Sequence, residues 1–184
     1  MITEKRDYKN MKVLIDTNVI LDVLLNRASF VQDAIAVLEL TCGNIQAYVS
    51  ASAITDIYYI AYKELRDKIR VKNLIKTILQ IITVAGISDK EIMSAIDSDW
   101  ADFEDSLQNA VAESHDCSMI ITRNISDFNG SNLQIISPKN FLKLLDFHSK
   151  NFYLRFVRAL KQFIKVLVKA DYNYFLEAKN EYHS

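Results

Sequence analysis

The stretch "VLIDTNVILDVLL", Val13 to Leu25, sets out the architecture of this chain. Its first three residues are a short apolar run, which predicts a buried strand, and the residues after Asp16 change to the apolar spacing of a helix. A carboxylate therefore stands at the end of a strand, directly before a helix. Two interpretations of Asp16 are open at this point: it caps the helix, or it is one arm of a metal-binding site.

The same alternation of strands and helices continues along the chain. Strands are predicted at residues 12–16, 45–50, 83–88, 118–122 and 133–137, and helices at 17–25, 30–42, 50–65, 67–82, 88–96, 102–116 and 137–145. The expected helix starts are a Thr17 cap, a Ser50 or Ser52 cap, a Ser88–Glu91 capping box and Pro138. Alternating strands and helices predict an α/β fold, in which helices cover both faces of a parallel sheet.

The composition narrows the possible fold classes and cellular locations but says little about binding partners. Half of the 184 residues are hydrophobic, and three Gly and one Pro argue against an all-β fold, which needs many turns. A net charge of −1 favours no partner. Cys42 and Cys117 form no CxxC motif, so we expect buried thiols in a reducing cytosol. We see no signal peptide or membrane-spanning run, and we therefore expect a cytoplasmic protein without a membrane partner.

The chain divides into three segments. Residues 1–10 are read as an N-terminal arm and residues 11–146 as one α/β domain; the first 146 residues hold 15 Lys and Arg against 20 Asp and Glu. Residues 147–184 hold seven against three, and their apolar spacing predicts a basic amphipathic helical tail. This tail could pack on the domain, join copies of the chain, or bind RNA through its basic and Tyr side chains; a membrane-surface helix is the weakest interpretation.

Four aspartates stand where a metal site could form. Asp16 and Asp127 follow strands, and the carboxyl ends of parallel strands meet at one edge of the sheet. Asp56 and Asp105 lie in predicted helices beside apolar residues. Taken singly, each is better explained as a cap, a turn residue or a surface acid. Together they indicate a site for Mg²⁺ or Mn²⁺, which prefer carboxylate oxygens. Asp22, about a turn and a half beyond Asp16, is expected to face elsewhere.

The order of these acids resembles the PIN domain family. "VLIDTNVILDVLL" is similar to that family's first strand and signature Asp, and "SASAITDIYYIAYK" to the helix with its second acid. "DFEDSLQNAVAESHDCSMIITRNISDF" is similar to the segment with the third and fourth acids and is the most specific part. The resemblance covers about residues 12–145. It is strongest to toxins of toxin–antitoxin systems that are related to VapC-type ribonucleases.

The resemblance implies a PIN-like nuclease domain that cleaves RNA with Mg²⁺ or Mn²⁺. Carried over by position, the catalytic acids are Asp16, Asp56, Asp105 and Asp127, of which Asp16, Asp105 and Asp127 hold the metal. Asp102 is an alternative or auxiliary to Asp105. Auxiliary roles also fall to Thr17, Asn18, Thr122 and Asn124, with capping an equal alternative for Thr17 and Thr122. Arg123 could contact a substrate phosphate, against a plain surface Arg. One departure is Asp56, because the family commonly has the longer Glu there.

Two classes of function follow. The first is a metal-dependent endoribonuclease, the toxin of a toxin–antitoxin pair, with an RNA substrate, an antitoxin partner and a homodimeric or higher assembly. The second is a catalytically weak PIN-fold scaffold that binds RNA or protein, which the shorter Asp56 keeps open. No Ser/His/Asp triad, P-loop or GxGxxG motif occurs. A metal-dependent phosphatase is disfavoured because Thr17-Asn18-Val19 follows Asp16 in place of a DxDxT motif.

Overall fold

A computed structural model describes residues 10–41 and 45–145 of the chain. It contains one five-stranded sheet in the order β3-β2-β1-β4-β5. All four strand pairings are parallel, as the sequence predicts. The strands are β1 (Met11–Ile15), β2 (Ile45–Ser50), β3 (Thr83–Ala85), β4 (Met119–Ile121) and β5 (Gln134–Ile136). The apolar runs read as strands therefore all join the sheet, although β3, β4 and β5 are shorter than predicted.

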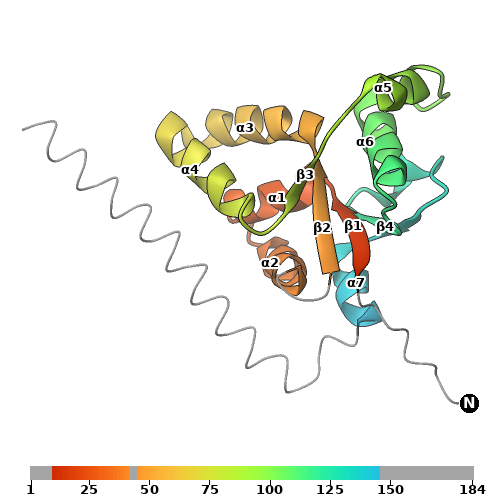
Figure 1. Cartoon of the computed structure of the whole chain (residues 1–184). Coiled ribbons are helices and arrows are strands. Elements are labelled where there is room, and N and C mark those ends of the chain that lie inside the picture. Colours follow the sequence, from red (N-terminus) through yellow and green to blue (C-terminus); the bar gives the residue numbers. More distant parts are fainter. Residues whose placement is uncertain (1–9, 42–44, 146–184) are drawn as a thin grey trace, which may run out of the picture.

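Helices cover both faces of this sheet, which confirms the predicted α/β sandwich. They are α1 (Thr17–Leu24), α2 (Val31–Leu40), α3 (Ala51–Leu65), α4 (Lys68–Ile78), α5 (Asp89–Ile96), α6 (Phe103–Ser114) and α7 (Pro138–Leu144). Helices α1 to α4 lie on one side and α5 and α6 on the other (Figure 1), while α7 packs against α2. A short 3₁₀ helix, η1 (Ile125–Phe128), follows β4 and was not predicted from the sequence.

The central strand β1 divides the interior into two hydrophobic cores. Val13 and Ile15 belong to the larger core under α1 to α4, and Leu14 belongs to the smaller core under α5 and α6. Successive residues of a strand point to opposite faces, so this split follows directly from the pleat. All three side chains are fully buried. The apolar run before Asp16 is thus required on both faces, and it fixes the carboxylate at the strand's end.

The predicted helix starts have mixed outcomes. The Ser88–Glu91 capping box is present, and its hydrogen bonds hold the pKa of Glu91 at about 2. Pro138 begins α7 as expected. Ser50 occupies the N-cap position of α3, but its hydroxyl pairs with that of Ser52 instead of capping the helix. The predicted Thr17 cap is wrong, because Thr17 is already inside α1.

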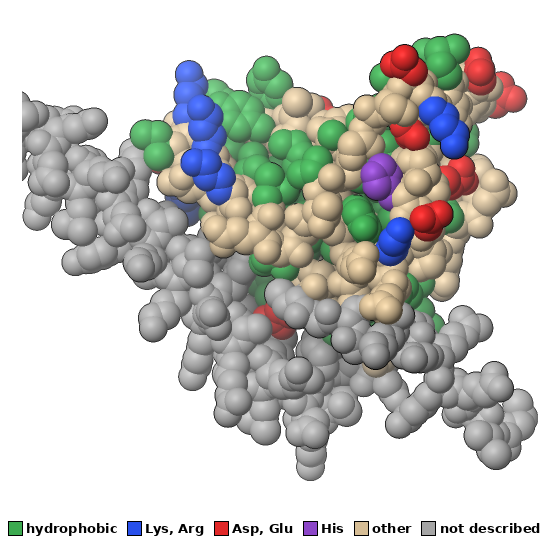
Figure 2. All heavy atoms as spheres, viewed as in Figure 1, with side chains coloured by type: hydrophobic (Ala, Val, Ile, Leu, Met, Phe, Trp, Pro, Cys, Tyr) green, Lys and Arg blue, Asp and Glu red, His purple; other side chains and the backbone are tan. Residues whose placement is uncertain are grey.

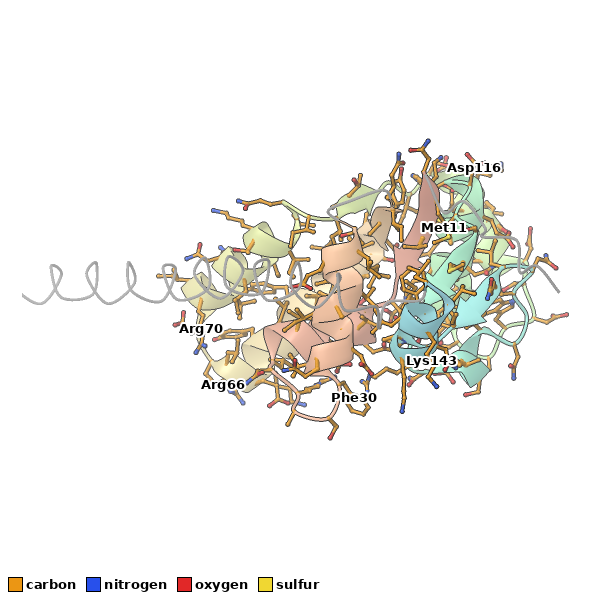
Figure 3. The ribbon with its side chains drawn as sticks, turned by 90° about the horizontal axis from the view of Figure 1, so that it is seen from below. Met11, Phe30, Arg66, Arg70, Asp116 and Lys143 are labelled. Atoms are coloured by element: carbon orange, nitrogen blue, oxygen red, sulfur yellow. The ribbon has the colours of Figure 1, made fainter. Side chains whose placement is uncertain are left out.

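The amino ends of the strands carry a small polar cluster. Lys12 Nζ donates to the backbone oxygen of His115 at 3.1 Å and pairs with Asp116 at 3.3 Å. Met11 and Asp116 mark this end of the sheet in the view from below (Figure 3). Cys117, also near this end, is buried as predicted, and burial raises the pKa of its thiol to about 11. We therefore expect a functional site at the opposite edge of the sheet, where the strands have their carboxyl ends.

Three predictions fall outside the described residues. They concern the N-terminal arm (except Asn10), the tail at 147–184 and Cys42. The expectations about them stay predictions. Among the helices in the described parts of the chain, none is long and apolar enough to cross a membrane.

Candidate active site

Asp16 lies where the order of strands reverses. The chain runs outward from β1 to β2 and β3 and then returns to β4 on the other side of β1. In open parallel sheets this reversal opens a crevice at the carboxyl ends of the strands, where ligands bind. The backbone N–H of Asp16 donates to Ile121 of β4 at 3.0 Å, and the residue is 5% exposed. The sequence position of Asp16 thus places its carboxylate at the edge of the sheet where ligands bind in folds of this kind.

Three neutral donors hold the Asp16 carboxylate. Thr122 Oγ1 donates to Oδ2 at 2.6 Å, and the side-chain amide of Asn18 donates to the same oxygen. Gln108 Nε2 donates to Oδ1 at 3.3 Å from α6. Burial raises the pKa of Asp16, and these hydrogen bonds oppose that shift without reversing it. The carboxylate is therefore fixed in position by groups that leave its charge uncompensated.

The cap interpretation of Asp16 is only half right. Asp16 holds the N-cap position of α1, and its backbone oxygen accepts from the N–H groups of Val19 and Ile20. Its side chain forms no cap hydrogen bond. The nearby backbone N–H groups of Thr17 and Asn18 still favour its ionised form. The backbone of Asp16 therefore caps the helix, whereas its carboxylate is held by the side chains of other residues.

Helix α6 brings further carboxylates to the same place. Asp102 caps this helix, with Oδ1 accepting from the N–H of Glu104 at 2.8 Å and of Asp105 at 3.3 Å. Glu104 Oε1 accepts from Thr17 Oγ1 and from Gln108 Nε2, both at 3.3 Å. The cap thus fixes the start of α6, and Glu104 in its first turn contacts α1 through Thr17.

The acids repel one another. Burial raises the pKa of Asp105 to about 7, and the charges of Asp102, Asp16 and Asp127 add to the shift. Burial also raises the pKa of Glu104, with further contributions from Asp56 and then Asp16. All four predicted catalytic aspartates therefore belong to one electrostatic cluster, which includes Glu104 as well.

The cluster is open rather than closed. Asp127 is exposed on η1, where Ser126 Oγ donates to its Oδ1 at 3.1 Å, and Asp56 is partly buried on α3. Across the described residues, no three acidic, His or Cys side chains converge as a ready-made metal site. Mg²⁺ commonly keeps several waters and needs only one or two carboxylates. The oxygen donors and their mutual repulsion therefore fit a hydrated hard cation, and they do not form a tight cage.

The auxiliary residues form a network around Asp16. Asn18 Nδ2 also donates to Thr122 Oγ1 at 3.0 Å, and Asn18 Oδ1 accepts from the N–H of Arg123 at 3.2 Å. Thr122 Oγ1 accepts from the backbone N–H of Asn124 at 2.9 Å. The segment after β4 is therefore fastened to the start of α1 through these two side chains.

The Arg123 side chain is engaged inside the protein. Its Nε lies 2.9 Å from Asp22 Oδ2, and its guanidinium stacks over the Phe30 ring, 4.2 Å from the ring centre. Arg27 pairs with the other Asp22 oxygen at 3.3 Å. Asp22 indeed faces away from the acidic cluster, but it is fully buried. A phosphate contact by Arg123 stays a prediction, and the structure supplies this guanidinium with two intramolecular partners.

Two residues of the site escaped the sequence reasoning. Glu104 was grouped with the surface acids around Asp105, and Gln108 drew no attention. Their spacing of four residues places both on one face of α6. A polar Gln inside an apolar helical stretch was the available signal. Such residues are seldom fully buried unless their polar atoms are satisfied.

Comparisons with known proteins agree with this geometry. A family model described as a PIN domain matches residues 12–126. The chain belongs to the PIN domain family. A curated relative of this PIN domain, Ribonuclease VapC1 of Aquifex aeolicus (strain VF5), is 26% identical over 136 residues, covering 71% of this chain and 92% of the relative.

Solved structures share the fold at low sequence identity. A chain of VapBC2 from Rickettsia felis, bound to a DNA fragment from its promoter, is 14% identical with a TM-score of 0.56, over 69% of this chain and 98% of that chain. PAE2754 from Pyrobaculum aerophilum is 16% identical with a TM-score of 0.52, over 73% and 89%. A chain of FitAB bound to the IR36 DNA fragment is 17% identical with a TM-score of 0.52, over 68% and 94%. The PIN-like α/β fold expected from the sequence is confirmed.

Proposed function

We propose that this PIN domain is a divalent-cation-dependent endoribonuclease, the toxin of a toxin–antitoxin pair. The family match and the ribonuclease relative support a nuclease. The observation that carries the proposal is the Asp16 carboxylate, which is buried at the strand reversal and held by neutral donors beside further acids. A carboxylate cluster of this kind suits a divalent cation, which in turn can bind a phosphate substrate.

The residues would divide the work as follows. Asp16, Asp105 and Asp127 would hold Mg²⁺ or Mn²⁺, which when bound neutralises phosphate charge and lowers the pKa of a water molecule. Asp56 would orient the attacking water and accept its proton. Thr122, Asn18 and Gln108 keep the Asp16 carboxylate in place.

Nearby residues would guide the RNA. Arg123 would contact a substrate phosphate, with its guanidinium shared between that phosphate and its partners Asp22 and Phe30. Basic side chains gather over α4, whereas acidic ones gather over α5 and α6 (Figure 2). These α4 residues are Lys68, Arg70, Lys72 and Lys76. A polyanion would therefore approach the acidic cluster most easily from the α4 side.

The partners follow from the same proposal. The substrate is RNA, and the toxin would be held inactive by an antitoxin protein, because the structural neighbours include VapBC2 and FitAB assemblies. We also propose a homodimer or higher oligomer and a cytoplasmic location, in line with the expectations from the sequence.

Cleavage of RNA by the purified full chain tests the proposal. We expect cutting with Mn²⁺ or Mg²⁺, none with EDTA, and a loss of at least ~10³-fold in Asp16→Asn, because a cation-anchoring charge is removed. The exposed Asp89 provides a matched control, and Asp89→Asn is expected to cut as well as the wild type. Undiminished cleavage by Asp16→Asn would refute the metal-site mechanism.

One observation keeps the scaffold alternative in view. Asp56 has a short side chain, and the described acids do not converge as a ready-made metal site. If the protein binds RNA in the same assay but does not cut it with any divalent cation, it is a scaffold rather than an enzyme.

A further inference from the structure

The two adjacent acids of α6 serve different neighbours. The charges that act most strongly on Asp105 are those of Asp102, Asp16 and Asp127, whereas those that act on Glu104 are those of Asp56 and Asp16. Consecutive helical residues point about 100° apart, so one helical turn can present carboxylates in two directions. The charge of Asp16 acts on both. Asp105 thus connects Asp16 with η1, and Glu104 connects Asp16 with α3.

Two donors hold Glu104 in that direction. Thr17 Oγ1 donates to Oε1 from the first turn of α1. Gln108 Nε2 donates both to this oxygen and to Asp16 Oδ1, each at 3.3 Å. One amide therefore bridges the two carboxylates. This bridge distinguishes Glu104 from an acid that only covers the surface of α6.

The Gln108 amide supplies a second, independent sign of a ligand. The residue is 1% exposed, and its Oε1 has no hydrogen-bond partner among the described residues. Leaving a buried acceptor without a partner is unfavourable, so such atoms in native proteins usually meet a water or an ion. The Nε2 of the same amide donates to Asp16 and Glu104, so this oxygen belongs to a side chain that is already part of the acidic cluster. A water molecule bound to a cation would satisfy it by donating a hydrogen bond.

We propose that Glu104 is a further acidic residue of the active site, which holds the cation or its bound water together with Asp16 and Asp56. The inference rests on the proposed metal-dependent function. Its physical basis is reach, because the Asp56 side chain has one methylene fewer and stands on the opposite helix, α3. Glu104 is bridged to Asp16 by the Gln108 amide, and the charge of Asp56 also acts on it. The long acid of this part of the site is therefore supplied by α6 rather than α3.

The affinity of the full chain for Mn²⁺ tests this inference. Titration calorimetry and the electron paramagnetic resonance signal of free Mn²⁺ both measure it. Glu104→Gln keeps an oxygen that can accept from Thr17 and Gln108 and removes only the charge. We expect its Mn²⁺ affinity to fall about 10- to 100-fold. Glu113→Gln changes an exposed acid on the same helix and is expected to bind like the wild type.

A second variant tests the shared space directly. In the background of Glu104→Gln, Asp56→Glu lengthens the acid on α3, and we expect it to restore most of the Mn²⁺ affinity. An affinity of Glu104→Gln equal to that of Glu113→Gln would overturn the inference. A defect that Asp56→Glu does not repair would also contradict it, because Glu104 and Asp56 would then not share one position.

The proposed function can fail separately. If the wild type binds no Mn²⁺ and cuts no RNA, the metal-dependent nuclease is refuted, and the role of Glu104 with it. If the wild type binds and cuts, and Asp105→Asn loses both while Glu104→Gln keeps both, only the role of Glu104 is refuted.

Discussion

Two aspartates of the opening stretch, Asp16 and Asp22, share nearly every property except their partners. Both are buried, at 5% and 0% exposure, and burial raises the pKa of each. Asp22 is paired with Arg123 and Arg27, so its charge is compensated within the protein. Asp16 is held by neutral hydroxyl and amide groups. Its neighbours on α6 are further acids.

The difference separates a carboxylate whose charge is paired inside the protein from one that we propose to be functional. A buried charge with cationic partners needs nothing from solution, and removing it leaves the partners unpaired. A buried charge among neutral donors and like charges raises the energy of the unliganded protein. Such unfavourable electrostatics are characteristic of functional sites, where a bound ligand can relieve them. Burial alone would have assigned the same role to both residues.

The largest expected effect comes from giving Asp16 the kind of partner that Asp22 has. Gln108→Lys places an ammonium group beside Asp16 and Glu104 in place of the bridging amide. We expect the unfolding temperature to become insensitive to Mn²⁺. In the wild type, Mn²⁺ at 100 times its dissociation constant should add about 2.7 kcal/mol to the stability.

Thermal unfolding with and without Mn²⁺ measures the effect. Gln32→Lys adds the same charge at an exposed position of α2 and should keep the Mn²⁺ response. A full response in Gln108→Lys would mean that cations bind away from Asp16, and the contrast with Asp22 would lose its functional meaning.

The next largest effect is on stability. Asp22→Asn leaves two guanidinium groups without their carboxylate, and both are partly buried, with about a quarter and a third of each side chain exposed. We expect a loss of about 2 kcal/mol in the free energy of unfolding, below the range for fully buried pairs because both arginines can rehydrate. Urea denaturation measures it.

Asp16→Asn is the matched comparison for that experiment. It removes a desolvated, uncompensated charge while keeping one acceptor oxygen, so its stability should stay within about 1 kcal/mol of the wild type. Asp22→Asn should retain cleavage per folded molecule. A variant pair with the opposite pattern, unstable at Asp16 and inactive at Asp22, would reverse the assignment of the two residues.

Much of the fold was predictable from the sequence because it depends on local patterns. Short apolar runs such as Val13–Ile15 become buried parallel strands, and the helices between them follow from 3.6-residue spacing. The exact ends depend on tertiary contacts that no local pattern contains. Thr17 looks like a cap by composition, yet its hydroxyl donates to Glu104, which is 87 residues away. The 3₁₀ helix η1 has no apolar period at all.

The site was predictable in its anchor and less so in its surroundings. The sequence points to Asp16 because strand ends converge at one edge of the sheet, and the resemblance to PIN domains assigns both Asp16 and Asp105, whose roles stay predictions. Glu104 and Gln108 could not be ranked above other polar residues of α6. Their importance comes from which residues of α1 and α3 face them, and that is set by the packing of α6 on the sheet. The partners of Asp22 are set in the same way.

The smallest expected effect concerns Asp105, which sharpens the comparison because it belongs with Asp16. Its pKa of about 7, against 3.8 for an ordinary Asp, means that the folded protein holds a proton which the unfolded chain releases. Between about pH 4 and pH 7 the unliganded wild type should therefore lose stability as the pH rises. Asp105→Asn lacks this loss and should be the more stable protein at pH 8.

The expected gap is about 1 kcal/mol at pH 8, well below the face value of the shift because Asp105 is partly exposed to solvent. It should vanish well below pH 4, where Asp105 is protonated in both the folded and the unfolded wild type. Urea denaturation in EDTA measures it. Mn²⁺ should close or reverse the gap, because the cation stabilises only the ionised cluster. A gap equal at both pH values would place Asp105 with the compensated carboxylates, beside Asp22, and would leave Asp16 without the acidic neighbour on which the contrast depends.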